Sequence, residues 1–215
     1  GKDFYYNNSI RDIVTVFGKL FSGIKINQKQ SDNTNKFIEV PIHFANQSKM
    51  YQRIFNPENG SISLPRLGFD FNISGVDEER KTSRLNQRQW SFSSETGQNK
   101  WSYNAVPYNF DFNLSVFTND IEDGLQIIEQ ILPNFQPSLT VKIKPFEGQD
   151  DTVDITIILE SVQNQFETKG QLLDRDYYTW DLNFTIKAWL WTEHVDDSNV
   201  ILDVSGVNVF EWSKL

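Results

Sequence analysis

Residues 178–190 read YTWDLNFTIKAWL and carry the most regular alternation of apolar and polar side chains in the chain. Every second residue is apolar, which is the period of a β-strand with one buried face. The apolar set is Tyr178, Trp180, Leu182, Phe184, Ile186, Ala188 and Leu190. The sequence therefore predicts a long, half-buried strand here.

The same alternation recurs earlier in the chain. It predicts further strands at residues 24–27, 36–44, 67–74, 108–116, 139–143 and 153–159. Pro41 interrupts the second of these, and because proline has no backbone donor it favours a sheet edge or a bulge. Since strands close in sequence tend to pair as hairpins, the sheet is expected to be largely antiparallel.

Two segments repeat their apolar residues at helical spacing. The first begins at Asn8 or Ser9 and runs to Phe21. The second begins after Asn119, the expected cap, with Glu122 three residues later as in a capping box. Its apolar face is expected to hold Ile121, Leu125, Ile128 and Leu132, widened by Ile127 and Ile131. A third, short helix is expected over 48–55. These elements predict an α+β fold with a largely antiparallel sheet and two or three flanking helices, one in the N-terminal segment.

Length and composition restrict the class of protein. The chain has 215 residues, and we expect a single domain over 1–215, with a long polar loop at about 76–100 and a C-terminal arm at about 198–215. It has no Cys and only two His, which excludes disulfides, thiol catalysis and Cys-based zinc sites. No apolar run approaches the 18 residues of a membrane-spanning helix, so no membrane partner is expected.

The charge is uneven along the chain. The net charge is -9, which argues against nucleic-acid binding. Residues 1–100 hold 14 Lys+Arg against 10 Asp+Glu, whereas residues 101–215 hold 6 against 19. This is either an ordinary solvated surface or two oppositely charged faces used in docking or subunit stacking.

The strand at 178–190 ends with an anomaly. The residues on its second face are polar up to Lys187, but the last two are Trp189 and Trp191. These side chains either form a second apolar layer or lie exposed as a binding patch. Exposed, they would also suit a carbohydrate-binding module, which is the main alternative function from composition alone.

Two other segments are candidates for partner contact. The polar stretch at 76–100 carries Arg80, Arg84 and Arg88, and it is either a mobile arm or two strand ends joined by a disordered tip. The C-terminal stretch either closes its own sheet or adds to the sheet edge of another chain. Its apolar residues are Val200, Leu202, Val204, Val207 and Val209, with a change of phase around Gly206.

Motifs for catalysis are missing from the sequence. It contains no GxxxxGK[ST], GxGxxG, GxSxG or HExxH motif. Acidic pairs such as Asp150–Asp151 and Asp196–Asp197 are typical of turns, although paired carboxylates could in principle hydrolyse glycosides. A binding or structural role is therefore favoured over an enzyme, and no cofactor or metal is expected.

Five segments, in this order, resemble a known family. They are Phe4–Ile26 (FYYNNSIRDIVTVFGKLFSGIKI), Lys36–Asn46 (KFIEVPIHFAN), Leu64–Phe71 (LPRLGFDF), Ile121–Ile143 (IEDGLQIIEQILPNFQPSLTVKI) and Trp180–Trp191 (WDLNFTIKAWLW). Together they resemble the tail sheath stabiliser, or tail completion, proteins of T-even-like contractile-tailed bacteriophages.

The resemblance implies a structural role in the virion. Members of such a family form a hexameric ring at the head-proximal end of the tail, after assembly in the host cytoplasm. The ring caps the last sheath ring, sits on the tube terminator and offers a surface to the neck. The implied partners are copies of the chain itself, the tail sheath protein, the tube terminator and the neck proteins.

Overall fold

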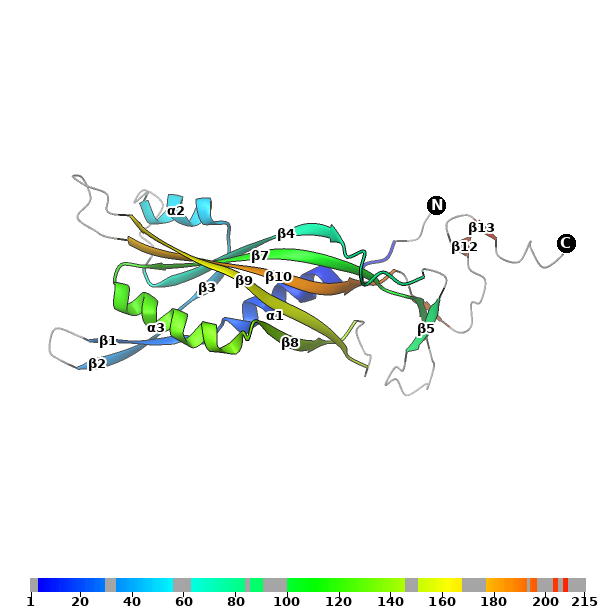
Figure 1. Ribbon diagram of the computed structural model, residues 1–215, viewed down its shortest axis with the longest axis horizontal. Coiled ribbons are helices and arrows are strands. Elements are labelled where there is room, and N and C mark those ends of the chain that lie inside the picture. Colours follow the sequence, from blue (N-terminus) through cyan, green and yellow to red (C-terminus); the bar gives the residue numbers. More distant parts are fainter. Residues whose placement is uncertain are drawn as a thin grey trace.

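The computed structural model describes residues 4–29, 34–55, 63–83, 86–90, 100–145, 151–167, 177–192, 194–196, 203–204 and 207–208. Its centre is a six-stranded sheet in the order β3-β4-β7-β10-β9-β8. The strands are β3 (Ile42–Phe44), β4 (Arg66–Val76), β7 (Val106–Thr118), β8 (Ser138–Ile143), β9 (Val153–Glu167) and β10 (Tyr177–Leu190). All neighbours pair antiparallel except β3 and β4, which are parallel. The expected α+β fold with a largely antiparallel sheet is confirmed (Figure 1).

Two helices and a hairpin cover one face of this sheet. They are α1 (Ser9–Leu20), α3 (Ile121–Ile131), which continues into the short 3-10 turn η2 (Leu132–Asn134), and the hairpin of β1 (Lys25–Lys29) and β2 (Asn35–Glu39). α2 (Gln47–Phe55) lies on the opposite face, where Tyr51 packs edge-on against Phe117 at 5.4 Å between ring centroids. Figure 1 shows α2 above β7 and β10, and α3 below them.

Phenylalanine rings dominate the core between the sheet and α1. The ring of Phe17 is fully buried and lies 4.4 Å from that of Phe112, 5.4 Å from that of Phe69 and 5.4 Å from that of Phe184. α3 approaches the sheet closely at Gly124, where the ring of Trp180 occupies the space that a Cβ would need. Leu182, Ile186 and Ala188 complete the buried face expected for the 178–190 strand.

The remaining described strands form small sheets. β5 (Gln87–Trp90), β6 (Lys100–Tyr103) and β11 (His194–Asp196) form a three-stranded sheet in the order β11-β6-β5. β12 (Asp203–Val204) pairs only with β13 (Val207–Asn208) among the described strands. β5 and the start of β6 lie inside the 76–100 stretch, in agreement with the alternative of two strand ends, and the strand at residues 87–90 has no period of its own in the sequence. Their sequence, QRQW, lacks the alternation that identifies a half-buried strand.

Two local predictions need correction. The strand expected over 36–44 is broken at Val40–Pro41 into β2 and β3, which belong to different sheets. The residue that caps α3 is Asp120, not Asn119, because the Asp120 carboxylate accepts a hydrogen bond from the backbone N–H of Glu122 at 2.9 Å.

Candidate assembly surfaces

Trp189 and Trp191 differ in their surroundings. Trp191 is 7% exposed and forms a small apolar cluster with Ala105, Val153 and Trp189, which agrees with the alternative of a second apolar layer and not with that of an exposed patch. Trp189 is half-buried, and the Arg80 guanidinium carbon lies 4.9 Å from its ring centroid. A pair of open aromatic faces for stacking on a sugar is therefore not formed by these two residues.

Arg80, one of the expected partner-binding arginines, is engaged within the monomer. Its Nε donates to the Asp77 carboxylate at 2.7 Å, and another guanidinium nitrogen donates to the side-chain oxygen of Asn109 at 3.2 Å. Lys187 lies 4.0 Å from the same carboxylate oxygen of Asp77. The arginine thus holds the residues that follow β4 against β7 and β10.

The Arg80 hydrogen bond lowers the pKa of Asp77, and the positive charge of the guanidinium lowers it further. A carboxyl whose folded-state pKa lies below its unfolded value of about 3.9 contributes its stability above that pH. The contribution is lost as the pH falls through the folded-state pKa. We therefore expect Arg80→Gln to lower the thermal midpoint at pH 7, and the difference from the parent chain to shrink at an acidic pH below the unfolded value of about 3.9.

Thermal unfolding followed by circular dichroism at both pH values checks this expectation. Lys81→Gln is the matched control, because the Lys81–Glu78 pair at 3.0 Å is exposed on both sides and should contribute little. An Arg80→Gln deficit that is equal at both pH values would show that packing on Trp189, and not the ion pair, carries the effect.

The other arginines expected to bind partners are not gathered with Arg80 into one described patch. Arg84 lies outside the described residues. Only the backbone of Arg88 is described, and it pairs with Ser102 across β5 and β6.

The C-terminal candidates are described only in part. Val200, Leu202 and Val209 lie outside the described residues. The backbones of Val204 and Val207 pair with each other between β12 and β13. No described strand of the six-stranded sheet pairs with either of them.

The second face of the main sheet carries a hydrogen-bonded polar network. Asn113 donates to Asn183 at 2.8 Å, and Asn183 donates in turn to Ser161 at 3.0 Å, which links β7, β10 and β9. Asp181 accepts from Ser115 at 2.7 Å and from Gln47 of α2 at 2.9 Å. This network fastens α2 to the sheet.

A shallow hollow of 490 Å³ lies on this polar face. Its lining includes three carboxylates, Asp70, Asp111 and Glu160. Burial raises the pKa of Asp70, and the negative charge of Asp181 raises it further. Among the described residues, no group of three or more His, Asp or Glu side chains is placed to hold a metal ion. We therefore interpret the hollow as the exposed surface of the polar network and not as a metal site.

An exposed apolar surface lies beside α3, where sequence reasoning expected core. Ile121 is 40% exposed and Leu125 is 48% exposed, so the expectation that they belong to the buried face is wrong. The buried residues of α3 are Asp123, Gly124, Ile127, Ile128 and Ile131. The signal was present in the sequence: apolar residues cover more of this helix than one sheet contact can bury.

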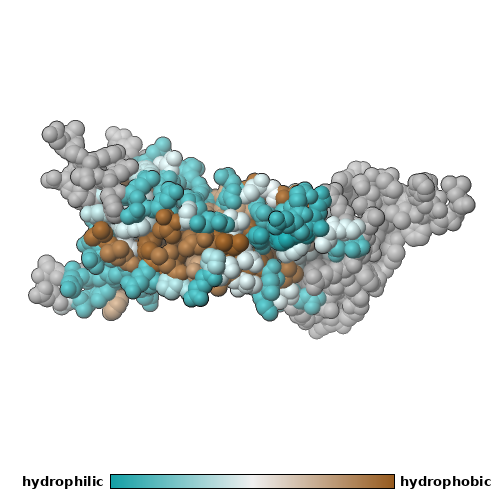
Figure 2. Space-filling model, viewed as in Figure 1, coloured by the Kyte–Doolittle hydropathy of each residue, from teal (hydrophilic) through white to brown (hydrophobic). Residues whose placement is uncertain are grey.

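β9 extends the same apolar surface. Its Val162 is 40% exposed and lies on the face of the sheet that α3 covers. Figure 2 shows a brown apolar band on this side of the molecule, over the region where Figure 1 draws α3 and β9. None of the described helices is long and apolar enough to cross a membrane.

Comparison with known proteins identifies the family to which the chain belongs. Residues 4–212 match the family described as T4-like virus Myoviridae tail sheath stabiliser. The chain is also 31% identical over 212 residues to the tail completion protein gp15 of Enterobacteria phage T4, an alignment that covers 93% of this chain and 76% of that protein. The similarity seen in the five sequence segments is thereby confirmed. The chain belongs to the tail sheath stabiliser family and is a structural tail protein of a T4-like contractile-tailed bacteriophage.

Proposed function

We propose that six copies of this chain close into a ring at the head-proximal end of the tail. The ring caps the last ring of the extended sheath, sits on the tube terminator and presents a surface to the neck proteins. It assembles in the host cytoplasm and holds the sheath extended until the tail is used. The family match over residues 4–212 is the observation that carries this proposal.

The chemistry of the surface supports assembly over catalysis. Exposed apolar side chains on α3 and β9 are typical of protein–protein contacts. A closed ring also needs two different surfaces that fit each other, which an uneven charge distribution can supply. The alternative of a carbohydrate-binding module needed Trp189 and Trp191 exposed together, and no described feature favours it.

We propose a second class of contacts for the segments that lead away from the main sheet. The C-terminal residues from about 198, with Val200, Leu202, Val204, Val207 and Val209, pair with a strand of the sheath or terminator protein. The basic stretch with Arg80, Arg84 and Arg88, together with Trp189 and Trp191, lies near this contact with the sheath or terminator protein. Backbone pairing of a terminal strand with another sheet would tie successive rings together.

Electron microscopy of tails assembled with and without this chain tests the proposal. Tails that contain it should show an additional ring at the end that joins the head, and an extended sheath. Tails without it should show sheath that contracts or detaches, and few joined heads. Extended, head-joined tails in the absence of the chain would contradict the proposed function.

A truncated chain that ends at residue 197 provides a second arm of this experiment. It should fold, because the described parts of the C-terminal segment, β12 and β13, pair only with each other among the described strands. It should nevertheless be lost from purified tails. Retention at the level of the full chain would remove the proposed role of this segment.

A further inference from the structure

The six-stranded sheet has an open edge along half of β9. The last residue pair between β8 and β9 is Ser138 with Ile158, and the N–H of Leu159 donates to the Pro137 carbonyl at 3.0 Å. Beyond this point, no described strand pairs with the outer side of Glu160–Glu167. Open edges are usually covered or blunted, because their free backbone groups can pair with another strand.

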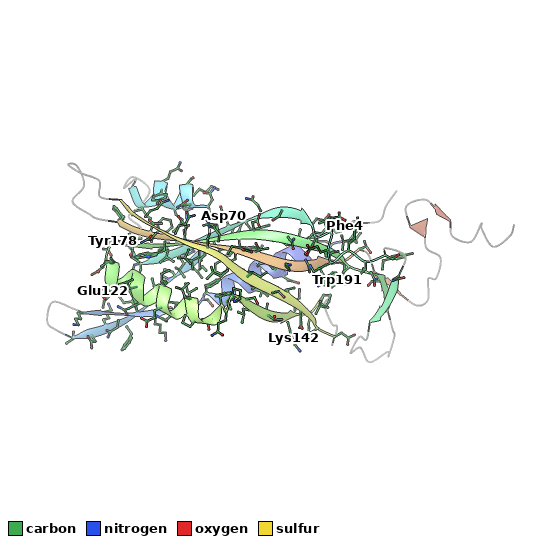
Figure 3. All side chains as sticks on the ribbon, in the orientation of Figure 1. Phe4, Asp70, Glu122, Lys142, Tyr178 and Trp191 are labelled. Carbon is green, nitrogen blue, oxygen red and sulfur yellow. The ribbon has the colours of Figure 1, made fainter. Side chains whose placement is uncertain are left out.

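Exposed apolar and acidic side chains accompany this open edge. Val162 of β9 and Ile121 and Leu125 of α3 are exposed, and α3 packs through Gly124 on Trp180, whose register partner on β9 is Asn164. The exposed charges of α3 are all negative, and Glu160 on β9 is negative too. We call this surface the acidic edge; it comprises Glu160–Glu167 with Ile121, Glu122, Leu125 and Glu129. Figure 3 shows Glu122 and Tyr178 at the same end of the molecule, far from Lys142 of β8.

The opposite edge of the sheet is β3, and it is apolar and basic. Phe44 is 61% exposed, although one side of its ring lies 5.4 Å from the ring of Phe69. His43, Arg53 and Lys49 are exposed, and the Nε of Arg66 is buried without a hydrogen-bond partner among the described residues. We call this surface the basic edge; it comprises Ile42–Phe44 with Lys49, Arg53 and Arg66.

The positive charges of the basic edge lie close enough to act on one another. Burial lowers the pKa of His43, and Arg66 and Arg53 lower it further. Burial also lowers the pKa of Arg66, with a further contribution from Arg53. A negatively charged neighbour would relieve this repulsion.

The strand register places the two edges at the same level of the sheet. Phe44 pairs with Phe69, Phe69 with Leu114, Leu114 with Leu182, and Leu182 with Val162. The exposed Phe44 and the exposed Val162 thus end a single row of side chains on one face of the sheet. Both ends of this row are apolar and accessible.

Strand direction is compatible with joining these ends. β3 is parallel to β4, and each further step through β7, β10 and β9 reverses direction, so β3 and β9 are antiparallel. A second copy placed alongside the first in the same orientation would set β3 against the open half of β9 as an antiparallel neighbour. Adjacent strands lie about 4.8 Å apart, which would bring Phe44 of one copy beside Val162 of the other.

We propose that the basic edge of each copy docks on the acidic edge of the next, so that β3 continues the sheet of its neighbour beyond Glu160–Glu167. Phe44 enters the apolar surface formed by Ile121, Leu125 and Val162 on one face of the sheet. On the other face, where α2 lies, Lys49, Arg53 and Arg66 approach Glu160. The contact joins two different surfaces, so each copy keeps one free edge until a ring closes. This inference rests on the proposed ring and names the surfaces that build it.

Because the chain has no cysteine, disulfide cross-linking can test the contact at chosen positions. Phe44→Cys and Val162→Cys are introduced together, and tails assembled with this chain in place of the parent are oxidised mildly. Positions opposite each other in an antiparallel pair have Cβ atoms close enough for a disulfide. Non-reducing electrophoresis should show a ladder of cross-linked species that ends at six copies.

Two controls make the test specific to a contact between unlike edges. Chains with only Phe44→Cys or only Val162→Cys should give little dimer alone, whereas a mixture of the two should give the mixed dimer. Phe37→Cys with Val162→Cys is the matched control, since Phe37 is 72% exposed but lies on the β1–β2 hairpin, and it should give no ladder.

The outcomes separate this inference from the proposed function. If the tails carry a ring but no cross-link forms between residues 44 and 162, the inferred contact is wrong and the proposed ring still stands. Efficient self-dimerisation through Val162→Cys alone also overturns it, because that result indicates that the acidic edges of two copies meet at β9. Tails that carry no ring of this chain overturn the proposed function itself.

Discussion

Phe17→Ala should lower the free energy of unfolding by about 3–5 kcal/mol, the usual cost of truncating a buried phenylalanine. Phe17 is fully buried where α1 meets the sheet, and its ring packs with those of Phe21, Phe69, Phe112 and Phe184. The truncation removes apolar burial, leaves a cavity and abolishes these ring contacts. A typical domain is stable by only about 5–15 kcal/mol, so much of the total would be lost.

Urea unfolding followed by tryptophan fluorescence measures this loss. Phe4→Ala is the control, because Phe4 is 93% exposed on the same N-terminal segment and its truncation should change stability by less than about 0.5 kcal/mol. A loss under about 1 kcal/mol for Phe17→Ala would mean that α1 is not clamped to the sheet as described.

Gly124→Ala should destabilise the chain by roughly 1–3 kcal/mol, against the rule for helices. In a helix interior this substitution ordinarily gains about 1 kcal/mol. Here an added Cβ would overlap the outer ring of Trp180, which is 5% exposed and held between α3 and the sheet. The cost of overpacking therefore exceeds the gain in helix propensity.

A compensating substitution identifies the cause. Trp180→Phe removes the outer ring atoms that the new methyl group would meet. Gly124→Ala should therefore cost less stability when it is added to the Trp180→Phe variant than when it is added to the parent chain. Glu129→Ala is the control on an exposed position of α3 and should be close to neutral. Additive losses in the double variant would show that the two residues do not interact.

Much of the fold follows from local patterns in the sequence. The alternation at 178–190 identified β10, and similar alternation identified β4, β7 and β8. The helical spacing from Ile10 to Phe21 identified α1. In each case one face of the element packs on the core, and that burial imposes the period that the sequence displays.

Patterns failed where a segment is not half-buried against the core. β9 runs on to Glu167, eight residues beyond its expected end at 159, because its second half lies at the sheet edge and carries polar residues on both faces. Residues 36–44 alternate regularly, yet Pro41 splits them between two sheets. Alternation records burial, and it does not record which strand is the neighbour.

The surfaces proposed for assembly could not be predicted from the sequence for the same reason, because alternation does not record which elements are neighbours. Trp189, Trp191 and Arg80 attract notice as residue types, but their exposure depends on packing with β7 and Asp77. The acidic and basic edges depend on strand order, which places Phe44 and Val162 at opposite margins of one row. No single-sequence pattern contains that order.

The side-chain amide of Asn7 donates to the carbonyls of Trp191 and Thr192, at 3.1 and 2.9 Å. These hydrogen bonds join the residues just before α1 to those just after β10, so the segment that leads into α1 and the end of β10 lie at the same pole of the molecule. Extensions of the chain at this pole would not touch the lateral edges that we propose to join copies in a ring. In the proposed assembly, related phages could therefore change their contacts along the tail axis while the circumference of the ring stays constant.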